Sequence, residues 1–225
     1  MKNSLKMESN HKMSPHFQKW SAGNLVCKAL YSSLLILHFS LFLFSCQEAE
    51  EADEYDRWQS RCEAYIDSIA RVAQANADGK WKTIRSFTLA EKDVNGTSAS
   101  WGTDDFVYCH VEKAGSGTER PFFTDSVRYN YRGRLIPTPA HPEGYVFDQS
   151  YKGTMDPDFN IPSMSEVGSL TNGVCSAIQQ MHVGDIWRIY VPAALGYGSS
   201  DRKSSGIPAY SALIFDMNLV EIIHP

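Results

Sequence analysis

The sequence of 225 residues predicts an α+β fold, with strands gathered in its second half and few helices. Two stretches carry this prediction, because apolar side chains recur at every second position, as in a strand with one buried face. These positions are Trp187, Ile189 and Val191 in the first stretch and Leu213, Phe215, Met217 and Leu219 in the second. The one strong helix signal in this half is residues 174–181, VCSAIQQM.

Residues 1–45 have the features of a secretory signal peptide, with lysines before an almost wholly apolar run from Ala29 to Phe44. The run is shorter than the ~20 residues that a membrane-spanning helix needs. Its end, Leu43-Phe44-Ser45-Cys46, resembles the bacterial lipobox, and this resemblance implies cleavage and lipidation at Cys46. The alternative is an uncleaved signal anchor that ends in a cysteine by chance.

An acidic run, QEAEEADEYD, begins directly after Cys46, and we expect residues 46–55 to form a solvated tether. It also resembles the surface-export tag of some Bacteroidetes lipoproteins. Without residues 1–45 the chain keeps 16 basic and 25 acidic residues, a net charge of −9, which argues against nucleic-acid binding. The expected location is the cell envelope, lipid-anchored in the outer membrane, on its periplasmic or surface-exposed face.

Residues 56–103 are predicted to be a helix followed by a linker with one or two short strands. Between Asp56 and Asp78 apolar side chains recur at spacings of three and four, and Gly79 can end the helix in the left-handed conformation. The apolar positions are Trp58, Cys62, Tyr65, Ile66, Ile69 and Val72. Such a helix packs either on the domain that follows or against a second copy, which would give a homodimer.

From residue 104 onward the chain is predicted to be mostly strands. Residues 106–112 form one strand, and residues 126–135 form another with Val127, Tyr129, Tyr131 and Leu135 on one face. The cysteines Cys62, Cys109 and Cys175 show no metal-ligand spacing, so we expect buried free thiols. One disulfide between two of them is the alternative. The sequence predicts no metal and no cofactor.

Several short motifs occur in the order and spacing of a known family. They are VGDIWRIYVPAALGYG, GIPAYSALIFDMNLV, YNYRGRL and GYVFDQSY. This set resembles the FKBP family of peptidyl-prolyl cis-trans isomerases over about the last 120 residues. The resemblance implies an FKBP-like domain at residues 104–225, in which a curved antiparallel sheet wraps around one short helix.

The same resemblance implies the residues of an apolar pocket. Phe215 would form a wall, Tyr197 would donate its hydroxyl to a ligand carbonyl, and Asp148 would be a buried polar group that orients the site. The backbone N–H of Thr171 would hold a second carbonyl, and Val174 stands where the family has a tryptophan. The other wall residues would be Tyr131, Phe147, Phe159, Leu170 and Ile207.

Prolyl isomerisation fits such a pocket, because rotation about an X–Pro bond crosses a barrier of ~18–20 kcal/mol and needs no nucleophile, metal or base. The expected substrates are proline-containing segments of exported proteins, whose folding the protein would assist. Two other classes remain open: a peptide-binding lipoprotein of the same fold with little catalysis, and a structural lipoprotein whose pocket is filled. For Tyr131 and Phe215 a plain core role is the alternative, since both lie on core-facing stripes.

Overall fold

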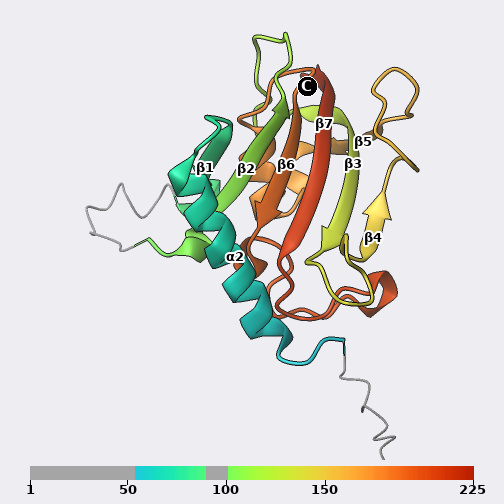
Figure 1. Cartoon of the computed structure of the whole chain (residues 1–225). Coiled ribbons are helices and arrows are strands. Elements are labelled where there is room, and N and C mark those ends of the chain that lie inside the picture. Colours follow the sequence, from blue (N-terminus) through green and yellow to red (C-terminus); the bar gives the residue numbers. More distant parts are fainter. Residues whose placement is uncertain (1–53, 90–100) are drawn as a thin grey trace, which may run out of the picture. The chain divides into compact units, whose positions relative to one another are not determined.

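The computed structural model describes residues 54–89 and 101–225, which belong to one compact unit (Figure 1). The predicted signal peptide of residues 1–45, nearly all of the acidic tether and the predicted lipidation site Cys46 lie outside the described residues. Within the described ranges, no helix is long and apolar enough to cross a membrane.

Seven strands form one sheet in which all pairs are antiparallel, as the sequence predicts. The spatial order is β1-β2-β6-β7-β3-β4, and β5 pairs with the same strand as β4 (Figure 1). The strands are β1 (Trp81–Arg85), β2 (Phe106–Lys113), β3 (Ser126–Leu135), β4 (Val146–Gln149), β5 (Ser163–Glu166), β6 (Ile186–Val191) and β7 (Leu213–Ile223).

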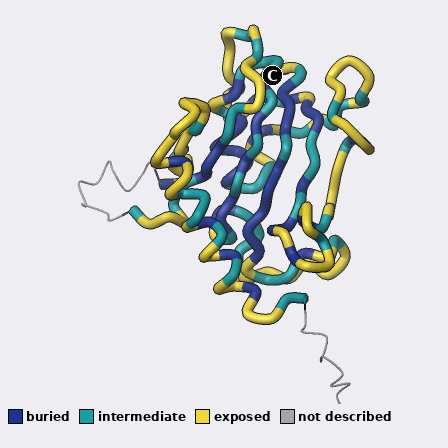
Figure 2. The backbone as a smooth tube through the Cα atoms, in the orientation of Figure 1, coloured by how far each residue is buried: buried dark blue, intermediate teal, exposed yellow. Residues whose placement is uncertain are grey.

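The central strands β6 and β7 show the predicted alternation. Ile189 stands opposite Phe215 in the register, so both side chains lie on one face, while Tyr190 stands opposite Ile214 on the other. The tube in Figure 2 is dark blue along these strands, and exposed residues gather in the loops. The core is therefore built around the middle of the sheet, where Ile189 and Leu213 are fully buried.

The short helix is α4 (Asn172–Ile178), which starts two residues before the predicted range and ends earlier. Thr171 is its N-cap, and the Cys175 N–H donates to the Thr171 carbonyl. Val174 on this helix lines a cavity together with Phe215, so α4 covers the Phe215 face of the sheet. The curved sheet around a short helix is thus confirmed.

The amphipathic helix is α2 (Trp58–Ala75), and it packs on the same unit rather than standing apart. The Tyr65 ring lies 6.3 Å from the ring of Tyr190, which places α2 on the face opposite α4. The Trp58 indole donates to the Ser211 hydroxyl at 2.8 Å and links the helix to the loop before β7. One expectation was wrong, because Val72 is 49% exposed rather than buried.

The end of α2 also differs from the expectation. The helix ends at Ala75, and the capping residue Asn76 adopts the left-handed conformation and donates its N–H to the Val72 carbonyl. Gly79 is left-handed too, but it lies in the turn that leads into β1. Asparagine adopts this backbone conformation more readily than most residues other than glycine, so the cap falls three residues before Gly79.

The three described cysteines, Cys62, Cys109 and Cys175, are free and buried, as predicted. Burial raises the pKa of the Cys62 thiol and of the Cys175 thiol to about 11, and it raises that of Cys109 further. Thiols with such raised pKa values hold their protons at neutral pH and act as small apolar core groups.

Candidate functional site

A cavity of about 210 Å³ opens on the α4 face of the sheet, between β3, β4, β7 and the start of α4. It gathers all the residues predicted for the site except Phe159 and Ile207. Its lining residues are Tyr129, Tyr131, Phe147, Asp148, Ser169, Leu170, Thr171, Val174, Tyr197, Phe215 and Met217.

Aromatic rings form the walls of this cavity. Phe147 on β4 and Phe215 on β7 meet edge to face, with ring centroids 5.7 Å apart. Gly133 on β3 permits this approach, since a β-carbon there would lie 2.5 Å from the Phe147 ring and 2.9 Å from that of Phe215. Tyr129 and Tyr131, two residues apart on β3, extend the wall with centroids 5.4 Å apart. The alternation of β3 therefore delivers both tyrosines to one face.

A hydrogen bond fixes the polar side of the cavity. The Tyr131 hydroxyl donates to Oδ2 of Asp148 at 2.7 Å, and the Gln149 N–H donates to Oδ1. Burial and this bond to a carboxylate raise the pKa of Tyr131, so the phenol keeps its proton. Asp148 itself is exposed, which corrects the expectation of a buried carboxylate. It lies on a short edge strand, where one side of the chain faces solvent.

Two hydrogen-bond donors border the apolar surface. The hydroxyl of Tyr197 bonds to no other residue of 54–89 or 101–225, and the guanidinium of Arg202 stacks on its ring at 4.8 Å. The Thr171 N–H, which precedes the first turn of α4, likewise finds no acceptor within those ranges. Both residues line the cavity, and the ligand-carbonyl role that the resemblance implies for these donors stays a prediction.

Val174 forms part of the floor and is 3% exposed, with the half-buried Leu170 beside it. The hydroxyl oxygen of Thr171 is buried and has no hydrogen-bond partner among the described residues. A valine at this place leaves more open volume than a larger aromatic side chain would. The floor of the cavity is therefore apolar, and its side chains leave part of the cavity volume open.

Two predicted wall residues lie elsewhere. Phe159 is 84% exposed, because the loop between β4 and β5 folds into a turn in which the Asn160 N–H donates to the Asp156 carbonyl. Ile207 is buried in the core but does not line the cavity. The family motifs predicted where the two loops lie in the sequence. The long loop around Phe159 has no periodic pattern, so its sequence does not indicate which way the Phe159 ring points.

The prediction also missed Tyr129, Ser169 and Met217, which line the cavity. A signal for two of them exists in the sequence, since Tyr129 lies two residues from Tyr131 and Met217 two residues from Phe215. Residues at this spacing share a face of a strand. Ser169 lies in the 3₁₀ turn Val167–Ser169 before α4, and no periodic pattern points to it.

An antiparallel sheet around one short helix, with an aromatic pocket between them, defines an FKBP-like domain. Residues 117–220 match the family model described as "FKBP-type peptidyl-prolyl cis-trans isomerase". This part of the chain is therefore similar to FKBP-type domains, and it lies within the predicted range of 104–225.

Proteins similar to this chain are named as peptidyl-prolyl cis-trans isomerases. The chain is 34% identical over 138 residues to peptidyl-prolyl cis-trans isomerase Mip of Coxiella burnetii, a match that covers 61% of this chain and 53% of that protein. It is 27% identical over 183 residues to the FKBP-type isomerase FkpA of Aeromonas hydrophila, with 80% and 61% covered. The matches thus span less than two thirds of the length of either relative.

Among solved structures, the chain is similar to a peptidyl-prolyl cis-trans isomerase from Pseudomonas syringae pv. tomato, with a TM-score of 0.47 and 22% identity. That similarity covers 72% of this chain and 95% of the other.

Proposed function

We propose that this protein is a peptidyl-prolyl cis-trans isomerase. The observation that carries the proposal is the aromatic pocket bordered by two unengaged donors, the Tyr197 hydroxyl and the Thr171 N–H. The match of residues 117–220 to the isomerase family model supports it. The substrate class is a polypeptide segment that contains proline.

The mechanism requires no proton transfer. The planar X–Pro amide is stabilised by C–N resonance, and the twisted amide loses this resonance and becomes less polar. A pocket walled by Phe147 and Phe215 removes water and favours the twisted form over the planar one. The Tyr197 hydroxyl and the Thr171 N–H would hold carbonyls on either side of the proline, so the chain rotates about one bond. An acceleration of about 10⁵ needs only ~7 kcal/mol of such differential binding.

One observation favours a second candidate function, a peptide-binding lipoprotein with little isomerase activity. Val174 occupies the floor, and a small side chain there offers less apolar contact to a proline ring. A proline ring that is held less firmly gives less of its binding energy to the twisted amide, so rotation is accelerated less, while the hydrogen-bond donors at the rim can still hold the peptide.

A protease-coupled assay on a tetrapeptide with an internal Leu-Pro bond separates the two. An isomerase accelerates the slow cis phase in proportion to protein concentration, and Phe215→Ala reduces the acceleration by more than about tenfold. Phe159→Ala is the matched control, because it removes the same ring from the exposed loop outside the pocket. Peptide binding without acceleration would support the second candidate, and absence of both would exclude both.

We also propose that the protein acts at the cell envelope on proline segments of exported proteins, anchored by lipid on Cys46. This proposal rests on the sequence of residues 1–46, which lie outside the described residues. In a lipoprotein-competent bacterium the protein should partition into detergent, and Cys46→Ala should abolish this partition or block processing. Unchanged partition and mass in Cys46→Ala would refute the lipid anchor. A homodimer through α2 is a further hypothesis, which sedimentation can test.

A further inference from the structure

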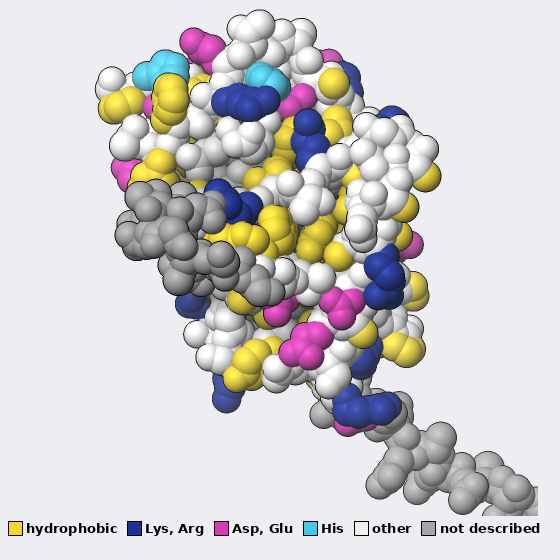
Figure 3. Space-filling view, turned by 90° about the vertical axis from the view of Figure 1, so that its left-hand side faces the viewer, with side chains coloured by type: hydrophobic (Ala, Val, Ile, Leu, Met, Phe, Trp, Pro, Cys, Tyr) yellow, Lys and Arg dark blue, Asp and Glu magenta, His cyan; other side chains and the backbone are white. Residues whose placement is uncertain are grey.

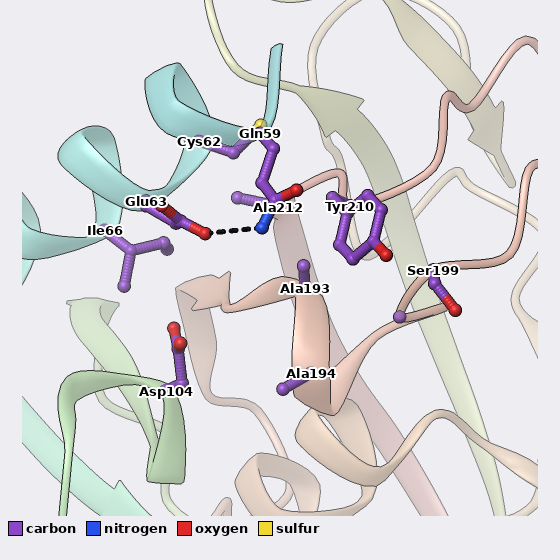
Figure 4. Close-up of a pocket in the computed structure, with 11 residues that line it drawn as sticks. Gln59, Cys62, Glu63, Ile66, Asp104, Ala193, Ala194, Ser199, Tyr210 and Ala212 are labelled. Atoms are coloured by element: carbon purple, nitrogen blue, oxygen red, sulfur yellow. Dashed lines mark hydrogen bonds between the residues drawn. The ribbon is translucent and has the colours of Figure 1, made fainter. Parts of the chain in front are cut away.

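A second cavity, of about 400 Å³, lies between α2 and the turn that follows β6 (Figure 4). The loop after β6 borders both cavities: Tyr197 lines the aromatic cavity of the candidate site, here called the proline pocket, while Gly198 and Ser199 line the second cavity. None of its lining residues belongs to the proline pocket. They are Gln59, Cys62, Glu63, Ile66, Asp104, Ala193, Ala194, Gly198, Ser199, Tyr210 and Ala212.

One side of this second cavity is apolar. Ile66 lies on α2, and Ala193 and Ala194 lie in the 3₁₀ turn Ala193–Leu195. Ala212 directly precedes β7. Small alanine side chains leave the space open. Tyr210 stands beside it, 42% exposed, and its N–H donates to the Gly198 carbonyl at 2.8 Å. That bond ties together the two loops that border the cavity.

Two acidic side chains also line this cavity, on the same side as Ile66 (Figure 4). Asp104 points from the turn Thr103–Asp105 toward the space between Ile66 and Ala193 (Figure 4). Glu63 lies on α2, where its Oε1 accepts a hydrogen bond from Gln59 at 2.8 Å. Acidic side chains also stand together on the lower half of the face in Figure 3.

The carboxylate of Asp104 makes no hydrogen bond or ion pair with any residue of the two described ranges. Asp104 is exposed, yet some loss of hydration at its carboxylate, together with the nearby Glu63, Asp67 and Asp105, raises its pKa. A negatively charged or apolar ligand group placed beside Asp104 would make its ionised carboxylate still less stable. A cation would stabilise that carboxylate, because an opposite charge compensates both the repulsion and the lost hydration.

We infer that this second cavity binds the side chain of a lysine or arginine within an extended polypeptide segment. The methylene stem lies against Ile66 and the alanines, and the charged head reaches Asp104 and Glu63. Long basic side chains combine these two features, since an apolar stem carries a charged tip. Charge complementarity therefore selects basic segments, and the alanine wall admits their stems. The inference does not depend on isomerase activity.

Titration of the full-length protein with a proline-free acetylated peptide, Ala-Leu-Arg-Leu-Ala, tests the inference. Its matched probe is acetylated Ala-Leu-Gln-Leu-Ala; with the C-terminus of both peptides amidated, the probe has the same length and no charge. The arginine peptide should bind about tenfold more tightly, and this preference should shrink as salt rises from about 50 to about 500 mM. Equal affinity of the two peptides would overturn the inference.

Variants then locate the binding. Asp104→Asn should lower the affinity for the arginine peptide by about three- to fivefold, as expected for a partly exposed charge pair. The affinity for the glutamine peptide should stay unchanged. Asp158→Asn, in the exposed loop before β5, changes the protein charge by the same amount outside the cavity and should have no effect. Equal losses in both variants would mean that only net charge matters, and the inference would fail.

A steric variant separates this cavity from other binding surfaces. Ala194→Met places a larger side chain at an exposed position on the cavity wall and should abolish arginine-peptide binding while the unfolding midpoint stays constant. Unaltered binding in Ala194→Met would refute the site. A dimer that Ala194→Met dissociates, with no peptide binding in either form, would show that a second copy occupies the cavity and would also refute it. Because the probes lack proline, these results are independent of the isomerase assay.

Discussion

The substitution Val174→Trp tests whether the floor of the aromatic cavity between α4 and the sheet is open. Val174 is 3% exposed and faces a cavity of about 210 Å³, so an indole has space on the ligand side. If the larger ring adds about 50 Å² of apolar contact with a bound proline, the gain is ~1.2 kcal/mol at ~25 cal/mol per Å². Peptide affinity should then increase about eightfold.

Two measurements check this prediction together. Calorimetric titration with a Leu-Pro peptide gives the affinity, and urea unfolding gives the stability, which should change by less than ~1 kcal/mol. Val107→Trp is the control, because Val107 is fully buried in β2 away from the pocket and should be overpacked by ~1–3 kcal/mol or more. A similar loss of stability in Val174→Trp, without tighter binding, would show that the floor is already filled.

Three further outcomes follow from the structure. Gly133→Ala should reduce peptide binding by about tenfold, since its β-carbon would lie 2.5 Å from a ring of the pocket wall; titration against Gly102→Ala, which meets nothing, checks this. The isomerisation rate should stay constant from about pH 6 to 9, because the raised pKa keeps Tyr131 protonated as pH rises. A midpoint in that range would contradict the mechanism. Trp58→Phe should cost about 1 kcal/mol of stability in urea unfolding, as the indole bond to Ser211 is lost; an unchanged midpoint would refute a role for that bond.

Much of the fold was predictable because strand alternation is a local property of the sequence. Residues 126–135 and 186–191 were predicted as strands, and both are strands in the structure. The limits of α4 were less predictable, since Thr171 occupies the N-cap position by its backbone geometry alone, without a capping hydrogen bond from its side chain. The sequence predicted helix α2 and the apolar face that packs on the domain. Only the folded structure shows that Val72, counted on that face, is exposed to solvent.

The candidate site was predictable where side chains lie on strands and less so where they lie on loops. Phe215 and Tyr131 reach the pocket because the strand period fixes their face. Phe159 lies in a loop, and a turn held by Asp156 and Asn160 directs its ring outward, which no periodicity encodes. The second cavity was not predictable at all, because residues from α2, from the turn before β2 and from the loops around β6 and β7 come together only in the folded chain.

The edges of the sheet carry a consequence for aggregation. Beyond β3 the edge is divided between β4 and β5, each of four residues, and the β3–β4 register shifts at Gly133 and Arg134. The opposite edge is β1, five residues long, with charged Lys82 and Arg85. Short, interrupted or charged edges pair poorly with foreign extended chains. Under the proposed function, a polypeptide substrate would therefore bind through the side-chain pocket and would leave without pairing its backbone with the sheet.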